Sequence, residues 1–498
     1  MAKGKQKHLA RKGRVRGARR AAASGQAVAA AGVAGAAAGA PADAAASAAA
    51  AEPHASRVAG SSRDARGDVP ALVAPGFPRC PHARACGACQ HVNEPYDAQL
   101  ARKNERMAQL FAEFEGARVL PILGMEHPYH YRNKVISPYA PGRKLARPAG
   151  EGAASRRRYG KDGRPLRGGG KGKGAAAPVR EILCGMYAAG THRIVATDEC
   201  LVENERAKKV VLAVRALMPK FGLAPYDEDA GTGFLRHAVV RVGHTSDEML
   251  VTLVTNGEEF PASRAFCREL VRRCPFVTTV VQNVNERQTN VILGERERTL
   301  YGPGFILDKL CGLSFRISSQ SFYQVNAVQT EVLYRQAVEL ARLSGGERVI
   351  DAYCGTGTIG LVAASHGAAE VIGVDSVASA IRDARENARH NGVENARFVA
   401  EDAGAFMRRL AAEGQHVDAV LMDPPRAGSS EEFLDSLVQL GPDRVVYISC
   451  NPQTQARDCR RLRDHGYELE AVQPVDMFPH TDHVETVACL TRKPGAGH

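Results

Sequence analysis

From residue 327 onward the chain alternates short apolar runs with amphipathic stretches, and this alternation constrains the fold more than any other feature. Runs such as "RVIDAY", "EVIGVDS" and "VVYIS" are continuously apolar and β-branched, which is typical of strands buried on both faces. Because helix-like stretches separate these runs, the pattern predicts βαβ units and a mostly parallel sheet. The predicted fold class is therefore α/β, with a Rossmann-like C-terminal domain over residues 317–498.

The pattern upstream divides the rest of the chain into three further parts. Residues 1–75 form a basic, Ala/Gly-rich tail that we expect to be disordered. Residues 76–233 contain a group of cysteines, a helix predicted over residues 96–115 and a flexible basic insertion at about 140–180. Residues 234–316 form a central β-rich domain, predicted as an antiparallel sheet from "HAVVRVG", "MLVTLVT", "TTVVQNV" and "TNVILGE", with one helix, "ASRAFCRELVRRC".

Composition favours a polyanionic partner such as RNA. The chain has 498 residues, a formal net charge of +12, twelve cysteines and no tryptophan. The tail suits non-specific contact with RNA phosphates, although an organellar transit peptide is an alternative. No run approaches the roughly 18 apolar residues that cross a membrane, and no secretory signal is evident. We therefore expect a cytoplasmic monomer whose cysteines stay reduced.

A glycine-rich turn marks a candidate cofactor site. "CGTGTIG" (354–360) follows a predicted strand and precedes a helix, which suits a nucleotide-type cofactor. Asp375 ends the next strand, where an acid can bind a ribose hydroxyl, although Asp375 and Asp402 could also merely end strands or cap helices. A dehydrogenase would share these features. The sequence "DPPR" (423–426) instead suits a methyltransferase that holds a planar base beside S-adenosylmethionine.

Cys450 follows the predicted strand "RVVYIS" and precedes an Asn-Pro turn. It is therefore expected at the carboxyl end of a strand, where open α/β sheets bind their ligands. Taken alone, this context also fits a buried, inert cysteine.

Five motifs in this order resemble those of the RNA uracil-5-methyltransferases, which use S-adenosylmethionine and have the class I methyltransferase fold. The resemblance covers about residues 80–490. The motifs are "SFYQVN" (321–326), "DAYCGTGTIGL" (351–361), "DPPRAG" (423–428), "YISCNP" (447–452) and "DMFPHTDHVETV" (476–487).

The resemblance implies roles for two residues. Cys450 would add as a thiolate to carbon 6 of uracil, which makes carbon 5 nucleophilic towards the methyl group. Glu485, expected on a final strand at the sheet edge beside Cys450, would then remove the carbon 5 proton. His480 and His483 are interpreted as structural or RNA-contacting, and Phe322 is a candidate for stacking on a flipped base.

The resemblance also implies a set of cofactor contacts. These are Gln324, Tyr353, Thr358, Asp375, Asp402 and Asp423.

The spacing Cys80-x5-Cys86-x2-Cys89 places three thiols within ten residues. A zinc site would normally pair two CxxC-like knuckles, whereas an iron–sulfur cluster can take a distant fourth cysteine. The resemblance assigns that position to Cys200, with Cys184 as the alternative, and so implies a 4Fe–4S cluster in an N-terminal cysteine region. Zinc remains the alternative metal.

The cysteine set also bears on the RNA target. Ribosomal RNA enzymes of the family typically carry it and bacterial tRNA enzymes typically lack it, which favours a uracil of 23S rRNA. The small OB-like domain with which many members begin is not evident in residues 1–75. A tRNA uracil-5-methyltransferase is the main alternative, and a non-catalytic RNA-binding or assembly factor is the alternative from another class.

Overall fold

The computed structural model describes residues 77–145 and 180–495, which lie within one compact unit, Ala45–His498. The tail predicted over residues 1–75 and most of the insertion predicted at about 140–180 fall outside the described residues. Within the described part of the chain, no helix is long and apolar enough to cross a membrane.

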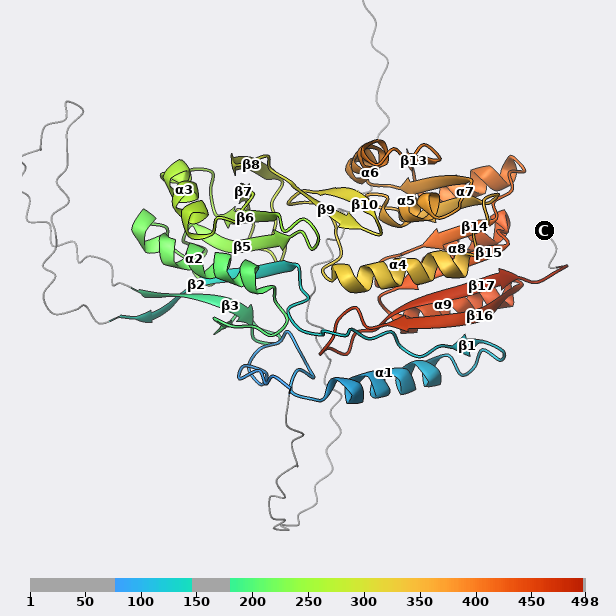
Figure 1. Ribbon diagram of the computed structural model, residues 1–498, viewed down its shortest axis with the longest axis horizontal. Helices are drawn as coiled ribbons and strands as arrows, with labels where there is room; N and C mark the ends of the chain where they lie inside the picture. Colours follow the sequence, from blue (N-terminus) through green and yellow to red (C-terminus); the bar gives the residue numbers. More distant parts are fainter. Residues whose placement is uncertain (1–76, 146–179, 496–498) are drawn as a thin grey trace, which may run out of the picture. The chain divides into compact units, whose positions relative to one another are not determined.

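The C-terminal part forms an eight-stranded sheet in the order β1-β16-β17-β15-β14-β11-β12-β13 (Figure 1). Neighbouring strands from β13 to β15 are parallel, as the sequence predicts, and β17 is antiparallel to both of its neighbours. β17 lies inside the sheet, so its expected position at the edge is wrong. The strands are β1 (Arg118–Val119), β11 (Arg348–Ala352), β12 (Glu370–Asp375), β13 (Ala396–Ala400), β14 (Ala419–Met422), β15 (Arg444–Ser449), β16 (Tyr467–Val475) and β17 (Glu485–Arg492).

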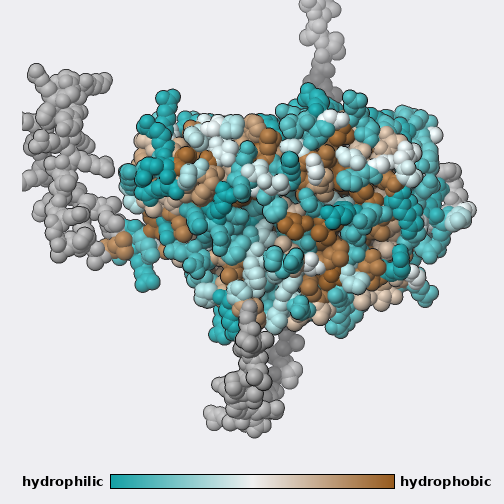
Figure 2. Space-filling model, viewed as in Figure 1, coloured by the Kyte–Doolittle hydropathy of each residue, from teal (hydrophilic) through white to brown (hydrophobic). Residues whose placement is uncertain are grey.

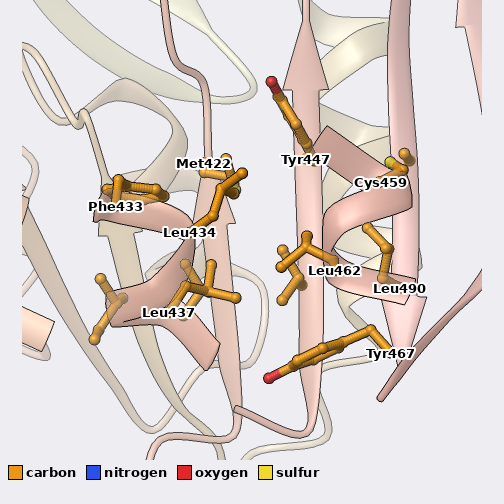
Figure 3. Close-up of a cluster of buried hydrophobic side chains, with 14 of the residues drawn as sticks. Met422, Phe433, Leu434, Leu437, Tyr447, Cys459, Leu462, Tyr467 and Leu490 are labelled. Carbon is orange, nitrogen blue, oxygen red and sulfur yellow. The ribbon is translucent and has the colours of Figure 1, made fainter. Parts of the chain in front are cut away.

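Helices cover both faces of this sheet, which confirms the predicted doubly wound α/β class. Side chains of α1, α7, α8 and α9 form the core on one face, and those of α4, α5 and α6 form the core on the other. Figure 3 shows Leu434 of α8 beside Met422 of β14, and Leu462 of α9 beside Leu490 of β17. The helices are α1 (Tyr96–Leu110), α4 (Ala327–Ala341), α5 (Thr358–Ser365), α6 (Ala378–His390), α7 (Ala403–Ala412), α8 (Glu431–Leu440) and α9 (Pro452–Asp464).

The structure also contains a seven-stranded sheet with the strand order β4-β3-β2-β5-β6-β7-β8. Helices α2 and α3 pack on one of its faces and bury the core there. A two-stranded unit, β9 and β10, leads from this sheet to α4. The elements are β2 (Lys134–Lys144), β3 (Arg180–Tyr187), β4 (Ile194–Ala196), α2 (Glu205–Phe221), β5 (Leu235–Val242), β6 (Met249–Thr255), α3 (Ser263–Arg273), β7 (Thr279–Val284), β8 (Arg296–Tyr301), β9 (Ile306–Leu310) and β10 (Leu313–Ile317).

The second sheet departs from the sequence prediction in three ways. β6 and β7 are parallel, so the sheet is mixed and not antiparallel throughout. "TNVILGE" (289–295) is irregular, and the strand predicted there begins instead at Arg296. The sheet also takes β2, β3 and β4 from before residue 234, while α1 and β1 join the eight-stranded sheet, so residues 76–233 are not one structural part.

The two sheets are joined through the segment that precedes α4. The backbone N–H of Asn133 donates to the Val325 carbonyl (2.8 Å), and its side-chain amide donates to the Gln324 carbonyl (3.1 Å). The buried guanidinium of Arg241 donates to the Ser321 carbonyl (2.5 Å).

The face of the molecule seen in Figure 2 is mainly hydrophilic, with apolar patches among the polar side chains.

Candidate active site

Five segments that carry predicted site residues meet at one edge of the eight-stranded sheet. Tyr353 follows β11, and Asp375 ends β12. Asp423 follows β14, Cys450 follows β15, and Glu485 begins the antiparallel strand β17. The chain reverses its direction of winding between β11 and β14, and such a reversal is where doubly wound sheets bind their ligands.

The turn after β11 is held in an unusual backbone conformation. Gly355 and Gly357 have φ of 54° and 79°, and a Cβ at Gly357 would lie 2.7 Å from the Phe398 ring. Tyr353 also has a positive φ, 62°, which costs a residue with a side chain about 1–2 kcal/mol. Its ring packs on Phe433, with centroids 4.9 Å apart. This packing fixes the turn against α8, and the turn leads directly into the N-terminus of α5, as at sites for nucleotide-type ligands.

Asp375 and Asp402 have partners within the protein. Asp375 accepts hydrogen bonds from the backbone N–H groups of Gly355 (3.0 Å) and Val377 (2.8 Å). Asp402 caps α7 by accepting from the backbone N–H of Ala405 (2.8 Å). The capping role considered from the sequence is therefore present. Asp375 in addition ties the end of β12 to the glycine turn.

Gln324 and Thr358 lie on different elements, the segment before α4 and the start of α5. Gln324 is half-buried in the segment before α4, where its carbonyl accepts from Asn133. Thr358 begins α5, and its hydroxyl lies 3.1 Å from the Tyr334 hydroxyl. Phe322 is 61% exposed, an unusual exposure for a large apolar side chain.

Two buried carboxyl groups, Asp351 and Glu485, lie near the half-buried Asp423 at this edge. Burial raises the pKa of Asp423 to about 7, and burial together with the nearby Asp423 raises the pKa of Glu485 to about 8. Burial also raises the pKa of Asp351 to about 8, although its carboxylate accepts from the backbone N–H of Gly360 (2.9 Å). Acids this close can all ionise only beside a positive charge, so the site suits a cationic ligand.

The sequence analysis did not single out Asp351. The sequence feature that could have indicated Asp351 is an acid inside the otherwise apolar run "RVIDAY". A buried carboxyl group is rare unless it is paired or functional.

Cys450 is half-buried at the turn between β15 and α9. Burial raises the pKa of its thiol to about 11, and the carboxyls of Glu485 and Asp423 add to this effect, while Arg426 opposes it. The Asn-Pro sequence starts α9, because the Asn451 side chain caps the helix and its amide donates to the Arg426 carbonyl (3.1 Å). The thiol is therefore held beside the acids, with Arg426 as the nearby cation.

The two histidines have different environments. His480 is fully buried, and its ring nitrogens lie 3.2 Å from the Gln99 amide nitrogen and 3.0 Å from the Pro128 carbonyl. These partners suit a neutral ring, and burial lowers the pKa of His480. His483 is exposed and contacts the Phe478 ring edge to face, with centroids 5.9 Å apart. His480 is thus structural, as one of the two interpretations held.

The four predicted metal-ligating cysteines line one small pocket. They are Cys80, Cys86, Cys89 and Cys200. Burial raises the pKa of Cys89 to about 12, and the other three thiols add to the increase, so all four lie within electrostatic range. The alternative, Cys184, lies apart in the core of the seven-stranded sheet.

Cationic side chains lie within electrostatic range of these thiols, among them Lys208 near Cys200. The guanidinium of Arg132 interacts with the thiols of Cys89 and Cys200 and donates to the Ala88 carbonyl (3.4 Å). Among the described residues, no three cysteine sulfurs lie within 4.8 Å of one another. A single zinc ion with Zn–S bonds of about 2.3 Å would need them closer.

The fold and the cofactor edge define the protein as a class I S-adenosylmethionine-dependent methyltransferase. Comparison with known proteins narrows this class, because residues 307–493 match the family model described as tRNA (uracil-5-)-methyltransferase. The chain belongs to this family and is an RNA methyltransferase. The glycine turn and the buried acids are the residues that would hold the cofactor.

Relatives and a solved structure agree. The chain is 41% identical to an RNA methyltransferase of Halalkalibacterium halodurans and 39% identical to one of Staphylococcus aureus, over 83% and 84% of each chain. It is 27% identical to Pyrococcus abyssi tRNA (uracil-54, C5)-methyltransferase, solved in complex with S-adenosyl-L-homocysteine. That match has a TM-score of 0.61 and covers 80% of this chain and 84% of the archaeal one.

The buried acids predict a pH-dependent preference for the charged cofactor. S-adenosylmethionine carries a positive sulfonium that S-adenosylhomocysteine lacks. With pKa values of about 7 and about 8, Asp423 and Glu485 are protonated below these values and ionised above them. Affinity for S-adenosylmethionine relative to S-adenosylhomocysteine should therefore rise between about pH 6 and about pH 9, as calorimetric titration at each pH can measure. A ratio that stays flat across this range would contradict the prediction.

Proposed function

We propose that the enzyme methylates carbon 5 of a uracil in RNA through a covalent bond between Cys450 and carbon 6. The observation that carries the proposal is the position of two groups. Ser449, at the end of β15, pairs with Thr486 of β17, so Cys450 and Glu485 leave adjacent strands at the same edge. The electrostatic effect of Glu485 on the thiol supports their proximity.

The reaction divides between these residues. The Cys450 thiolate adds to carbon 6, and the electron pair of the carbon 5–carbon 6 double bond moves onto carbon 5 and the carbonyl oxygen. S-adenosylmethionine, when bound, would supply an electrophilic methyl group; carbon 5 takes this group as the sulfur–methyl bond breaks, and S-adenosylhomocysteine is left. Once carbon 5 is methylated, the Glu485 carboxylate takes the carbon 5 proton. That C–H electron pair re-forms the double bond, and the carbon–sulfur pair returns to Cys450.

RNA contact is supported by charge and by one aromatic side chain. The net charge of +12 suits a phosphate backbone, and the exposed Phe322 is placed to stack on a base turned out of its helix. All twelve cysteines are free, which supports action in a reducing compartment such as the cytoplasm.

We further propose that Cys80, Cys86, Cys89 and Cys200 hold a 4Fe–4S cluster. Support comes from the shared pocket, from sulfurs spread wider than one zinc ion needs and from the Arg132 guanidinium, which suits a group of net negative charge. The cluster would stabilise the fold of the segment that contains Cys80, Cys86 and Cys89, and it would take no part in methyl transfer.

A uracil of 23S rRNA is the proposed target, because the cysteine set is typical of the ribosomal branch of the family. A tRNA target is the second candidate, and the similarity to the archaeal tRNA enzyme favours it. A non-catalytic assembly factor is disfavoured, because it would have no need for a thiol and a buried carboxyl at the cofactor edge.

The division of roles predicts opposite outcomes for two variants. In Glu485→Gln, attack and methylation should proceed while the carbon 5 proton stays, so a methylated enzyme–RNA adduct should accumulate. It would appear on a denaturing gel as a slower, radiolabelled band. Cys450→Ala should give neither adduct nor product. Normal turnover by Glu485→Gln, or an adduct formed by Cys450→Ala, would refute the assignment.

The proposed cluster predicts about four iron and four sulfide per chain in protein purified without oxygen. Cys86→Ser should lose the visible iron–sulfur absorbance, because one thiolate ligand is lost. Cys184→Ser, outside the pocket, is the matched control and should keep it. Zinc without iron in elemental analysis would overturn the assignment.

The RNA target can be decided with purified substrates. The enzyme should transfer labelled methyl groups from S-adenosylmethionine to 23S rRNA lacking the modification, and nuclease mapping should place the label on carbon 5 of a uracil. Unmodified tRNA is the parallel substrate. Labelling of tRNA alone would establish the second candidate, and labelling of neither would favour the assembly factor.

A further inference from the structure

Glu485 is carried by the segment that joins β16 to β17, residues 476–484, here called the 476–484 loop. The position of the Glu485 carboxyl depends on this loop, because Glu485 is the first residue of β17 and pairs with Val475, the last residue of β16. Cys450 lies on a different connection, between β15 and α9. The two groups are therefore positioned by separate parts of the chain.

One face of α1 is hydrogen-bonded to the 476–484 loop. Four polar residues of α1, spaced by three, four and three positions, share this face: Tyr96, Gln99, Lys103 and Arg106. Although α1 and the loop are some 370 residues apart, α1 lies beside the red C-terminal strands in Figure 1.

An ion pair fixes the start of the loop. Lys103 donates to Asp476 at 2.7 Å, and the Tyr96 hydroxyl donates to the other oxygen of Asp476 at 2.8 Å. The side chains of Lys103 and Asp476 are 4% and 0% exposed, so the pair is almost completely withdrawn from water. Such a pair is sensitive to geometry, because a displaced partner leaves a buried charge uncompensated.

Gln99 fixes the middle of the loop. Its side-chain oxygen accepts from the backbone N–H of His480 (3.1 Å), and its amide nitrogen lies 3.2 Å from Nδ1 of His480. The same amide donates to the carbonyls of His91 and Glu94, at 2.9 Å each. In return, the backbone N–H groups of Gln90 and His91 donate to the His480 carbonyl. Gln99, fully buried, thus joins the loop to the segment that follows the cysteines.

The end of the loop is held at the surface. Arg106 donates to the Asp482 carbonyl at 2.6 Å, and the His91 ring lies 2.7 Å from the Asp482 carboxylate. Met107 follows Lys103 by one helical turn on the same buried side of α1 and packs in the core on the eight-stranded sheet. The buried side of the helix therefore contacts both the sheet core and the loop, while the side that carries Gln109 is exposed.

We infer that the polar face of α1 positions Glu485 for the proton-removal step, with Gln99 and Lys103 as the principal positioning residues. This inference rests on the proposed function, in which Glu485 takes the carbon 5 proton and the carbon–sulfur bond of Cys450 breaks. Because Cys450 is held by another connection, a change in α1 acts on release of the methylated RNA and leaves the earlier methylation step nearly intact.

The inference is tested with full-length Gln99→Met, which preserves side-chain length and removes the hydrogen bonds to His480. The matched control is Gln109→Met, the same replacement on the exposed side of α1, where the side chain bonds only to Glu105 (3.1 Å). In single turnovers with the RNA target that lacks the modification, Gln99→Met should transfer methyl within about threefold of the parent rate. Decay of the denaturation-resistant adduct should slow about tenfold or more, since small misplacements of reacting groups have large effects.

Gln109→Met should match the parent protein in both steps. Arg106→Ala, at the exposed end of the same face, should slow adduct decay in the same direction and serves if Gln99→Met does not fold. Equal slowing of both steps, or unchanged adduct decay in Gln99→Met and Arg106→Ala, would overturn the inference. Failure of the proposed function has a different signature, because Glu485→Gln itself would then accumulate no adduct.

Discussion

Strand β17 enters the eight-stranded sheet between β15 and β16 and runs antiparallel to both. Its first residue, Glu485, therefore lies at the edge where the parallel strands end, while its side chains complete the cores on both faces. A parallel strand in this position would present its last residue there instead. The proximity of Glu485 to Cys450 follows from this one reversal, and so does the need for a loop, residues 476–484, to carry it.

The chemistry of the edge is governed by the cost of burying charge. Asp351, Asp423 and Glu485 favour their neutral forms in the protein alone, because burial raises the pKa of each carboxyl. The same acids oppose formation of the Cys450 thiolate. A cationic ligand at this edge would favour the ionised form of the acids, and its charge would offset part of their effect on the pKa of the Cys450 thiol.

The sequence predicted much of the fold, because buried parallel strands and amphipathic helices each have a local pattern. It also predicted that Cys450 and Asp423 would lie at strand ends. It failed where the deciding contact was distant. The exposed strand β8, "RERTLY", has no apolar alternation. The parallel pairing of β6 and β7 was missed although the helix predicted between them is the usual crossover of parallel strands. The contact between α1 and the 476–484 loop could not be predicted either, because Lys103 and Asp476 are 373 residues apart in the sequence.

The same separation bears on how the protein folds. Apolar side chains of α1 pack in the same core as those of α9, and β1 pairs with β16. An early part of the chain therefore completes a sheet that is built from its last strands. Contacts of such long sequence separation form slowly, since a large loop must close before they stabilise anything. During synthesis Met107 and Phe111 must wait for residues beyond 450 before they are covered. The segment that follows the cysteines is thus synthesised early and packed late. Until it is packed, its apolar side chains are exposed and can bind chaperones or aggregate.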